Sequence, residues 1–122
     1  MQTGSRNLRG RVELALVEGA PHIRLVGECD LETAPAVQEL LSHLLENGES
    51  RIVFDLQRVT FLDSSILSIF LIAYREAASA GGEVVLLCRP GFISRLLILL
   101  EMNRLVRVCT PEEWRQQIAA VH

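Results

Sequence analysis

The feature that most constrains the fold is a long helical run between two short apolar runs. Residues 52–56 and 84–88 are almost continuously apolar, and each has the length of one buried strand. Residues 64–80 between them are apolar at helical spacing and stop at Gly81 and Gly82, which are typical of a helix end. A strand placed between helices usually belongs to a parallel sheet, so the centre of the chain predicts an α/β domain.

The segment before this centre predicts a hairpin. Apolar residues alternate over 12–17 and 22–27 on either side of a turn at 18–21, which favours two antiparallel strands. With the helices and strands that follow, the element order is β-β-α-β-α-β-α-β-α. We therefore predict a small mixed sheet, mostly parallel with an antiparallel first strand, and about four helices.

Two of the helices have recognisable start signals. Thr33 is a predicted N-cap for the first helix, and Pro35 suits its first turn. Thr110, Pro111 and Glu113 place a cap, a proline at the first helical position and a glutamate three residues after the cap. The last helix should therefore begin at residue 111.

Composition and charge limit the class of protein and its partners. The chain has 122 residues and a net charge of −3, so we expect a tail over 1–10, one domain over 11–122 and no nucleic-acid partner. No apolar run has the length of a membrane span, and no signal segment follows the N-terminus, so we expect a cytoplasmic protein without a membrane partner. Cys29, Cys88 and Cys109 lack C-x-x-C spacing and are interpreted as buried thiols in a reducing compartment, not as redox or metal sites.

The start of the central helix carries the candidate chemistry. Residues 57–62 are predicted to connect the preceding strand to Asp63, Ser64 and Ser65, which are polar residues between two apolar segments. One interpretation is that Asp63 or Ser64 caps the helix, an interaction of about 1 kcal/mol. The other is that the Ser64 hydroxyl receives a phosphate, because a helix N-terminus offers unpaired N–H groups and partial positive charge.

A catalytic serine is the weaker interpretation of Ser64. A nucleophilic serine needs a base, and no G-x-S-x-G elbow surrounds this one. His22 and His43 lie on a predicted strand and a predicted helix, and neither is marked as a partner for Ser64. The residue chemistry therefore does not indicate an enzyme.

Two carboxylates are expected near Ser64. Asp30 and Asp63 each follow a predicted strand, and the loops after parallel strands gather at one edge of a sheet, where ligands commonly bind. Together with Ser65 they either surround a phosphorylation site or make ordinary turn and cap contacts. Two loop carboxylates are not a full metal ligand set, and no phosphate-binding or dinucleotide motif is present, so no metal or cofactor is predicted.

The predicted central helix has apolar residues on nearly every face, so the apolar residues outside its core face need an explanation. Leu67, Leu71 and Tyr74 fall outside the face that suits the core. Either neighbouring helices cover them, or they form an apolar patch that docks a partner protein. The residues predicted for the core face are Ile66, Ile69, Phe70, Ala73 and Ala77.

These elements together resemble a known family. The sequence Gly-Glu-Cys-Asp at 27–30, the strand at 52–56, Phe-Leu-Asp-Ser-Ser at 61–65 and Gly-Gly-Glu at 81–83 resemble the STAS domain. In particular, the chain is similar to bacterial anti-sigma factor antagonists, and the resemblance covers nearly all of it, from about Val12 to Val121. It implies a small sheet with helices packed mainly on one side.

The resemblance also implies a function. In that family an anti-sigma factor with serine kinase activity phosphorylates the serine after the aspartate, which is Ser64 here. The unphosphorylated protein binds the anti-sigma factor and frees a sigma factor, the phosphorylated form lets go, and a PP2C-type phosphatase restores the unphosphorylated form. We expect a protein that is monomeric alone, that needs no cofactor and that regulates transcription by partner switching. The predicted partner-binding residues are Ile66, Leu67, Leu71 and Tyr74.

The chain departs from the family pattern beside Ser64. The pattern usually continues Asp-Ser-Ser-Gly-Leu-Gly, whereas here Ile66 and Ser68 replace the two glycines. Bulk beside Ser64 would narrow the access of a kinase or change which partner fits. The alternative is a constitutive STAS scaffold subunit without a phosphoswitch, in a stressosome-like or transport-associated assembly.

Overall fold

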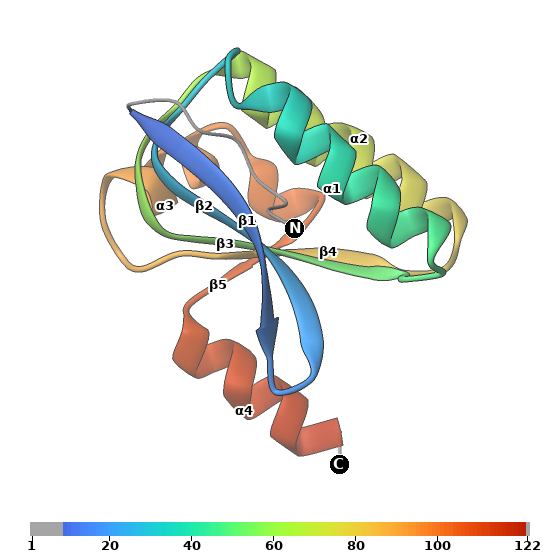
Figure 1. The fold of residues 1–122 in the computed structure, drawn as a ribbon. Coiled ribbons are helices and arrows are strands. Elements are labelled where there is room, and N and C mark those ends of the chain that lie inside the picture. The colour runs from blue at the N-terminus through green and yellow to red at the C-terminus, as the bar shows by residue number, and fades with distance from the viewer. Residues whose placement is uncertain (1–8, 122) are drawn as a thin grey trace.

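The predicted order of strands and helices is confirmed. The computed structural model describes residues 9–121, and for residues 120 and 121 it describes the backbone only. A short 3₁₀ helix at Met102–Arg104 occupies part of a segment predicted as a loop. The elements, drawn in Figure 1, are β1 (Gly10–Val17), β2 (Ala20–Cys29), α1 (Ala34–Glu46), β3 (Arg51–Leu62), α2 (Ser64–Ser79), β4 (Glu83–Leu87), α3 (Phe92–Leu99), β5 (Arg107–Cys109) and α4 (Pro111–Val121).

One five-stranded sheet organises the domain. Its strand order is β1-β2-β3-β4-β5, so each strand pairs with its neighbour in the sequence. The β1–β2 pair is antiparallel and the other three pairs are parallel, as predicted. The predicted tail at 1–10 falls mainly on residues outside the described part of the chain, and Gly10 is already the first residue of β1.

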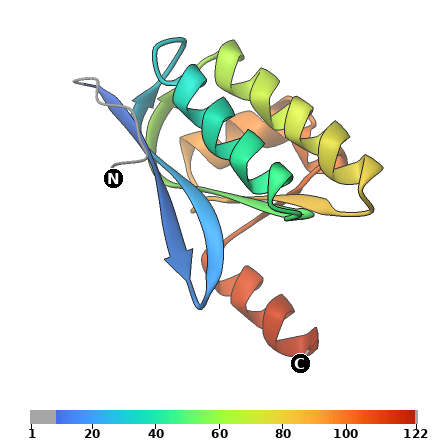
Figure 2. The same cartoon turned by 45° about the vertical axis from the view of Figure 1, so that its right-hand side comes forward.

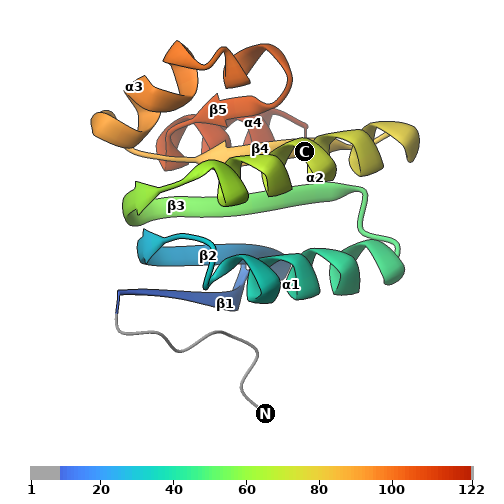
Figure 3. The same cartoon turned by 90° about the horizontal axis from the view of Figure 1, so that it is seen from above.

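The helices lie on both faces of the sheet, but unequally. α1 and α2 run side by side across one face, and α4 crosses the other (Figures 1, 2 and 3). Ile93 and Leu97 of α3 join the same large core as α1 and α2, whereas Trp114 of α4 packs in a smaller cluster with Val53 and Val85. Among residues 9–121, three α-helices therefore share one side of the sheet, and α4 partly covers the other.

The alternation of side chains along β3 explains the two cores. Successive residues of a strand point to opposite faces. Phe54 accordingly lies in the large core, where its ring centroid is 4.8 Å from that of Phe70 on α2, whereas Val53 lies in the cluster under α4. A short strand that is buried on both faces is therefore continuously apolar in sequence.

The connection predicted over residues 57–62 is wrong, because β3 continues to Leu62. Arg58 and Val59 pair with Val26 and Gly27 of β2, and Leu62 pairs with Cys29. Sequence periodicity did not reveal this part of the strand. Its pairing with β2 has irregular register, and several of its side chains are exposed to solvent. Because β3 ends at Leu62, Asp63 directly follows the strand and directly precedes α2.

The two helix starts behave differently. Thr110 and Glu113 exchange the predicted bonds: the Glu113 N–H donates to Thr110 Oγ1 at 3.1 Å, and the Thr110 N–H donates to Glu113 Oε1 at 2.8 Å. Thr33 precedes α1 but makes no side-chain cap, because its backbone is already helical with ψ −21°. Its hydroxyl instead bonds back to Asp30, accepting from the N–H and donating to the carbonyl, both at 2.8 Å.

The three cysteines are free and buried, as predicted. Cys88 lies in the large core and Cys109 in the cluster on the opposite face, so these two thiols are separated by the sheet. Burial raises the pKa of the Cys29 and Cys88 thiols to about 11, which keeps them protonated at neutral pH. Among the described residues no helix is long and apolar enough to cross a membrane.

Candidate functional site

The register of β2 and β3 brings the two predicted carboxylates to the same edge of the sheet. Cys29 and Leu62 are paired residues at the ends of these parallel strands. Asp30 and Asp63 each come next in the chain, so they leave the sheet side by side. The Leu31 N–H lies close enough to the Asp63 carboxylate to lower its pKa, which relates the β2–α1 loop to the start of α2.

Asp63 caps α2. Its backbone is extended, and its Oδ1 accepts from the N–H of Ser65 at 3.0 Å and of Ile66 at 3.3 Å. The Ser65 hydroxyl donates to the same oxygen. The cap interpretation therefore holds for Asp63 and not for Ser64, and Ser65 supports the cap.

The Asp63 carboxyl is held in its charged form. Desolvation raises its pKa, but the hydrogen bonds from the Ser65 hydroxyl and from the N–H groups of Ile66, Ser65 and Leu31 together outweigh it, so the pKa is lowered. A lowered folded-state pKa means that the ionised carboxylate stabilises the fold above the unfolded pKa. This contribution is lost as the pH falls through the folded pKa.

Replacing Asp63 with asparagine is expected to show how much the carboxylate charge contributes to the free energy of unfolding. The asparagine side chain would still cap the helix but would bring no negative charge to its N-terminus, so Asp63→Asn should unfold about 1 kcal/mol more easily at pH 7. At pH 3, which is below the pKa of about 3.9 of an aspartate in the unfolded chain, part of this contribution is lost and the gap should shrink. Urea unfolding of both proteins at the two pH values measures it; a gap of equal size at both would contradict the charge assignment.

Ser64 is exposed at the first position of α2. Within the described part of the chain its hydroxyl makes no hydrogen bond, since Asp63 does the capping. Its carbonyl accepts from the Ser68 hydroxyl at 2.8 Å. The side chain is thus free to react, while the backbone beneath it is fixed by the first turn of the helix.

Asp30 orders the neighbouring loop. Its Oδ1 accepts from the Glu32 N–H at 3.0 Å, and its Oδ2 accepts from Arg9 Nη2 at 2.9 Å. The turn and cap interpretation therefore describes what Asp30 does within this chain. A direct part in a phosphorylation site stays a prediction.

Exposed apolar side chains surround this edge, and sequence reasoning missed two of them. Leu31 is 73% exposed next to Asp63, and Phe61, three residues before Ser64, is 46% exposed. Leu71 on α2 is 37% exposed, in agreement with its predicted place outside the core face. Leu31 and Phe61 therefore leave apolar surface accessible close to Ser64. The position of Leu31 in a polar loop, between Asp30 and Glu32, could have indicated that its side chain is exposed.

The predicted core face of α2 is confirmed, and it corrects the assignment of Ile66 to the partner surface. Ile66 is 0% exposed and lies in the large core with Ile69 and Phe70. Its side chain therefore neither contacts a partner nor adds bulk beside Ser64. Leu67 and Tyr74 are half-buried against the core, so the accessible apolar surface of α2 is narrower than predicted.

No base or metal site accompanies Ser64 in the described residues. His22 is buried on the sheet near Asp55 and Arg24, and the His43 ring bonds to Asn47 at the end of α1. No group of three potential ligands among the described residues is arranged to hold a metal ion. Among the described residues, neither histidine is therefore in a position that marks it as a base for Ser64.

A mixed five-stranded sheet with an antiparallel first pair, and an Asp-capped helix after β3, defines a STAS fold. The chain belongs to the STAS family: the family model described as "Mlab, STAS domain" matches residues 12–107.

Solved structures share this fold. An anti-sigma factor antagonist from Mycobacterium paratuberculosis is 22% identical, with a TM-score of 0.71 over 84% of this chain and 86% of that one. The Bacillus cell fate determinant SpoIIAA in its phosphorylated form is 22% identical, with a TM-score of 0.67 over 88% of this chain and 98% of that one. The unphosphorylated SpoIIAA is 24% identical with the same TM-score, over 88% and 97%.

Proposed function

We propose that this protein is an anti-sigma factor antagonist that is switched by phosphorylation of Ser64. It acts without being an enzyme: it binds an anti-sigma factor with serine kinase activity and thereby releases a sigma factor. The observation that carries the proposal is the exposed Ser64 hydroxyl, which bonds to no group in the described part of the chain because Asp63 provides the cap. The similar fold of SpoIIAA, which exists in a phosphorylated form, supports it.

The effect of a phosphate follows from the occupied cap. Phosphorylation adds about −1.5 to −2 charges. The N–H groups of Ser65 and Ile66, which would favour an anion, already donate to the Asp63 carboxylate. The phosphate would therefore compete with an ionised Asp63 and place charge beside exposed Phe61 and Leu31, which disfavours an apolar interface.

Phosphate mapping tests the modified residue. Incubation with the cognate anti-sigma factor kinase and ATP should add one phosphate by mass spectrometry. The phosphate should be absent in Ser64→Ala and present in Ser68→Ala, because Ser68 is exposed on the same helix but its hydroxyl already donates to the Ser64 carbonyl. A PP2C-type phosphatase should remove it. A phosphate that maps to another residue would refute the proposed switch.

A second candidate is a constitutive STAS scaffold subunit, in a stressosome-like or transport-associated assembly. It is favoured by Ile66 and Ser68, which replace two glycines usual in the phosphorylated family pattern. Ile66 is built into the core, so this part of the helix is more rigid than a glycine pair would make it. The binding experiment that opens the Discussion separates the two candidates.

A further inference from the structure

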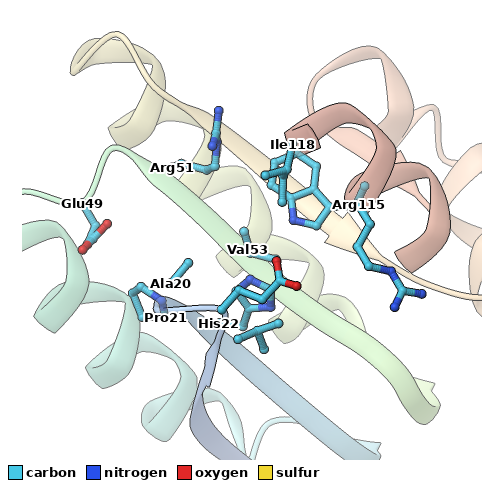
Figure 4. Close-up of a pocket in the computed structure, with 11 residues that line it drawn as sticks. Ala20, Pro21, His22, Glu49, Arg51, Val53, Arg115 and Ile118 are labelled. Atoms are coloured by element: carbon cyan, nitrogen blue, oxygen red, sulfur yellow. The ribbon is translucent and has the colours of Figure 1, made fainter. Parts of the chain in front are cut away.

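The face of the sheet opposite α1 and α2 is hollowed. A cavity of about 370 Å³ lies between the turn of the β1–β2 hairpin and α4 (Figure 4). A second cavity of about 260 Å³ adjoins it, and the two share Val17, His22, Trp114 and Arg115. α4 is the single helix on this face in the described part of the chain, so the hollow is where the sheet is left uncovered.

The cavity contains a buried donor that has no acceptor. Trp114 is 5% exposed and lines both cavities, and its Nε1–H bonds to no group in the described part of the chain. A buried polar group without a partner costs free energy, and such groups in native proteins are usually satisfied by water or a ligand. The guanidinium of Arg51 lies 5.2 Å from the centre of the indole ring, but its Nε donates to Glu83 at 3.1 Å, so Arg51 is already paired.

Arg115 supplies the cation at the other end of the cavity. Its nearest carboxylate in the described chain is Glu112 at 3.8 Å, which is too long for a hydrogen bond. Figure 4 shows Glu49 at the opposite end from Arg115. Glu18, on the hairpin turn, is a second acidic residue in the cavity lining. Desolvation lowers the pKa of His22 more than Asp55 raises it, so the imidazole is neutral at pH 7 and adds no charge.

We infer that this cavity binds a small monocarboxylate with an apolar body. The carboxylate accepts hydrogen bonds from Trp114 Nε1 and from Arg115. It thereby gives the unpaired indole N–H an acceptor and the weakly paired guanidinium a counter-charge. The apolar body lies against Val17, Val53 and Ile118. The site is on the face opposite α2 and is independent of any event at Ser64.

Intrinsic fluorescence gives a direct test, because Trp114 is the chain's only tryptophan. Titration with decanoate should change the emission of the protein with a saturable, one-to-one curve. Arg115→Ala should weaken binding about tenfold through the lost charge-assisted bond. Arg104→Ala is the matched control and should bind as wild type does, since Arg104 also pairs with a glutamate three residues away but lies outside the cavity.

Three further variants separate the site from general adsorption. Ala20→Phe fills the cavity from the exposed hairpin and should abolish the signal while leaving the melting temperature unchanged. Trp114→Phe, followed by calorimetry, should weaken binding by removing the donor, and Glu18→Gln should tighten it. A titration that does not saturate, equal affinity in all variants, or decanol binding as tightly as decanoate would overturn the inference. Ser64→Ala should bind decanoate normally, so this result does not depend on the proposed phosphoswitch.

Discussion

Ser64→Asp is expected to weaken the binding of the cognate anti-sigma factor at least about a hundredfold. The substitution puts a fixed negative charge at the start of α2, beside an Asp63 carboxylate that stays ionised at neutral pH. In the proposed interface it also adds a charge to desolvate beside Phe61 and Leu31, which are exposed in this structure. An uncompensated charge or a like-charge contact in an interface costs several kcal/mol, which is the source of the hundredfold estimate. Calorimetric titration of the purified proteins measures it.

Ser79→Asp is the matched control for this experiment. Ser79 is the last residue of the same helix, is exposed, and donates its hydroxyl to a backbone carbonyl as Ser68 does. Its substitution adds the same charge far from Asp63 and should leave the affinity within about threefold of wild type. If Ser64→Asp binds as tightly as wild type, the phosphoswitch fails and the constitutive scaffold becomes the better account.

The sheet and most helix boundaries could be predicted because local signals agreed with the final packing. The apolar strands around α2, the glycines after it and the reciprocal cap at Thr110 each specify a structure without tertiary information. The end of β3 could not be predicted in this way. Its pairing with β2 passes through two irregularities, between Arg24 and Val26 and between Gly27 and Glu28, which no periodicity shows.

The position of the two aspartates at one edge of the sheet could be predicted, but the contacts that each of them makes could not. That Asp30 and Asp63 meet at one edge follows from parallel pairing. Which of them caps α2, and that Ser64 is left free, depends on backbone angles and hydrogen bonds. The exposure of Leu31 and Phe61 was missed because a large apolar residue is assigned to the core by default. The cavity under α4 depends on how that helix crosses the sheet, which the sequence does not specify.

Ile66→Gly, which restores the glycine usual at this position of the family pattern, is expected to destabilise this protein by about 4 kcal/mol. Ile66 has no exposed surface, and truncating a buried isoleucine to alanine already costs about 2–5 kcal/mol through lost burial and the cavity left behind. Glycine within a helix adds about 1 kcal/mol. Urea unfolding monitored by circular dichroism measures the change.

Ser68→Gly serves as the comparison for Ile66→Gly. Ser68 is exposed, and beyond the helix cost it loses one hydrogen bond to the Ser64 carbonyl, so we expect a loss of about 1–2 kcal/mol. A large difference between the two variants means that Ile66 is a core residue around which this chain has repacked. Equal, small losses would instead mean that the start of α2 tolerates glycine, and that the departure from the family pattern lies at the partner surface after all.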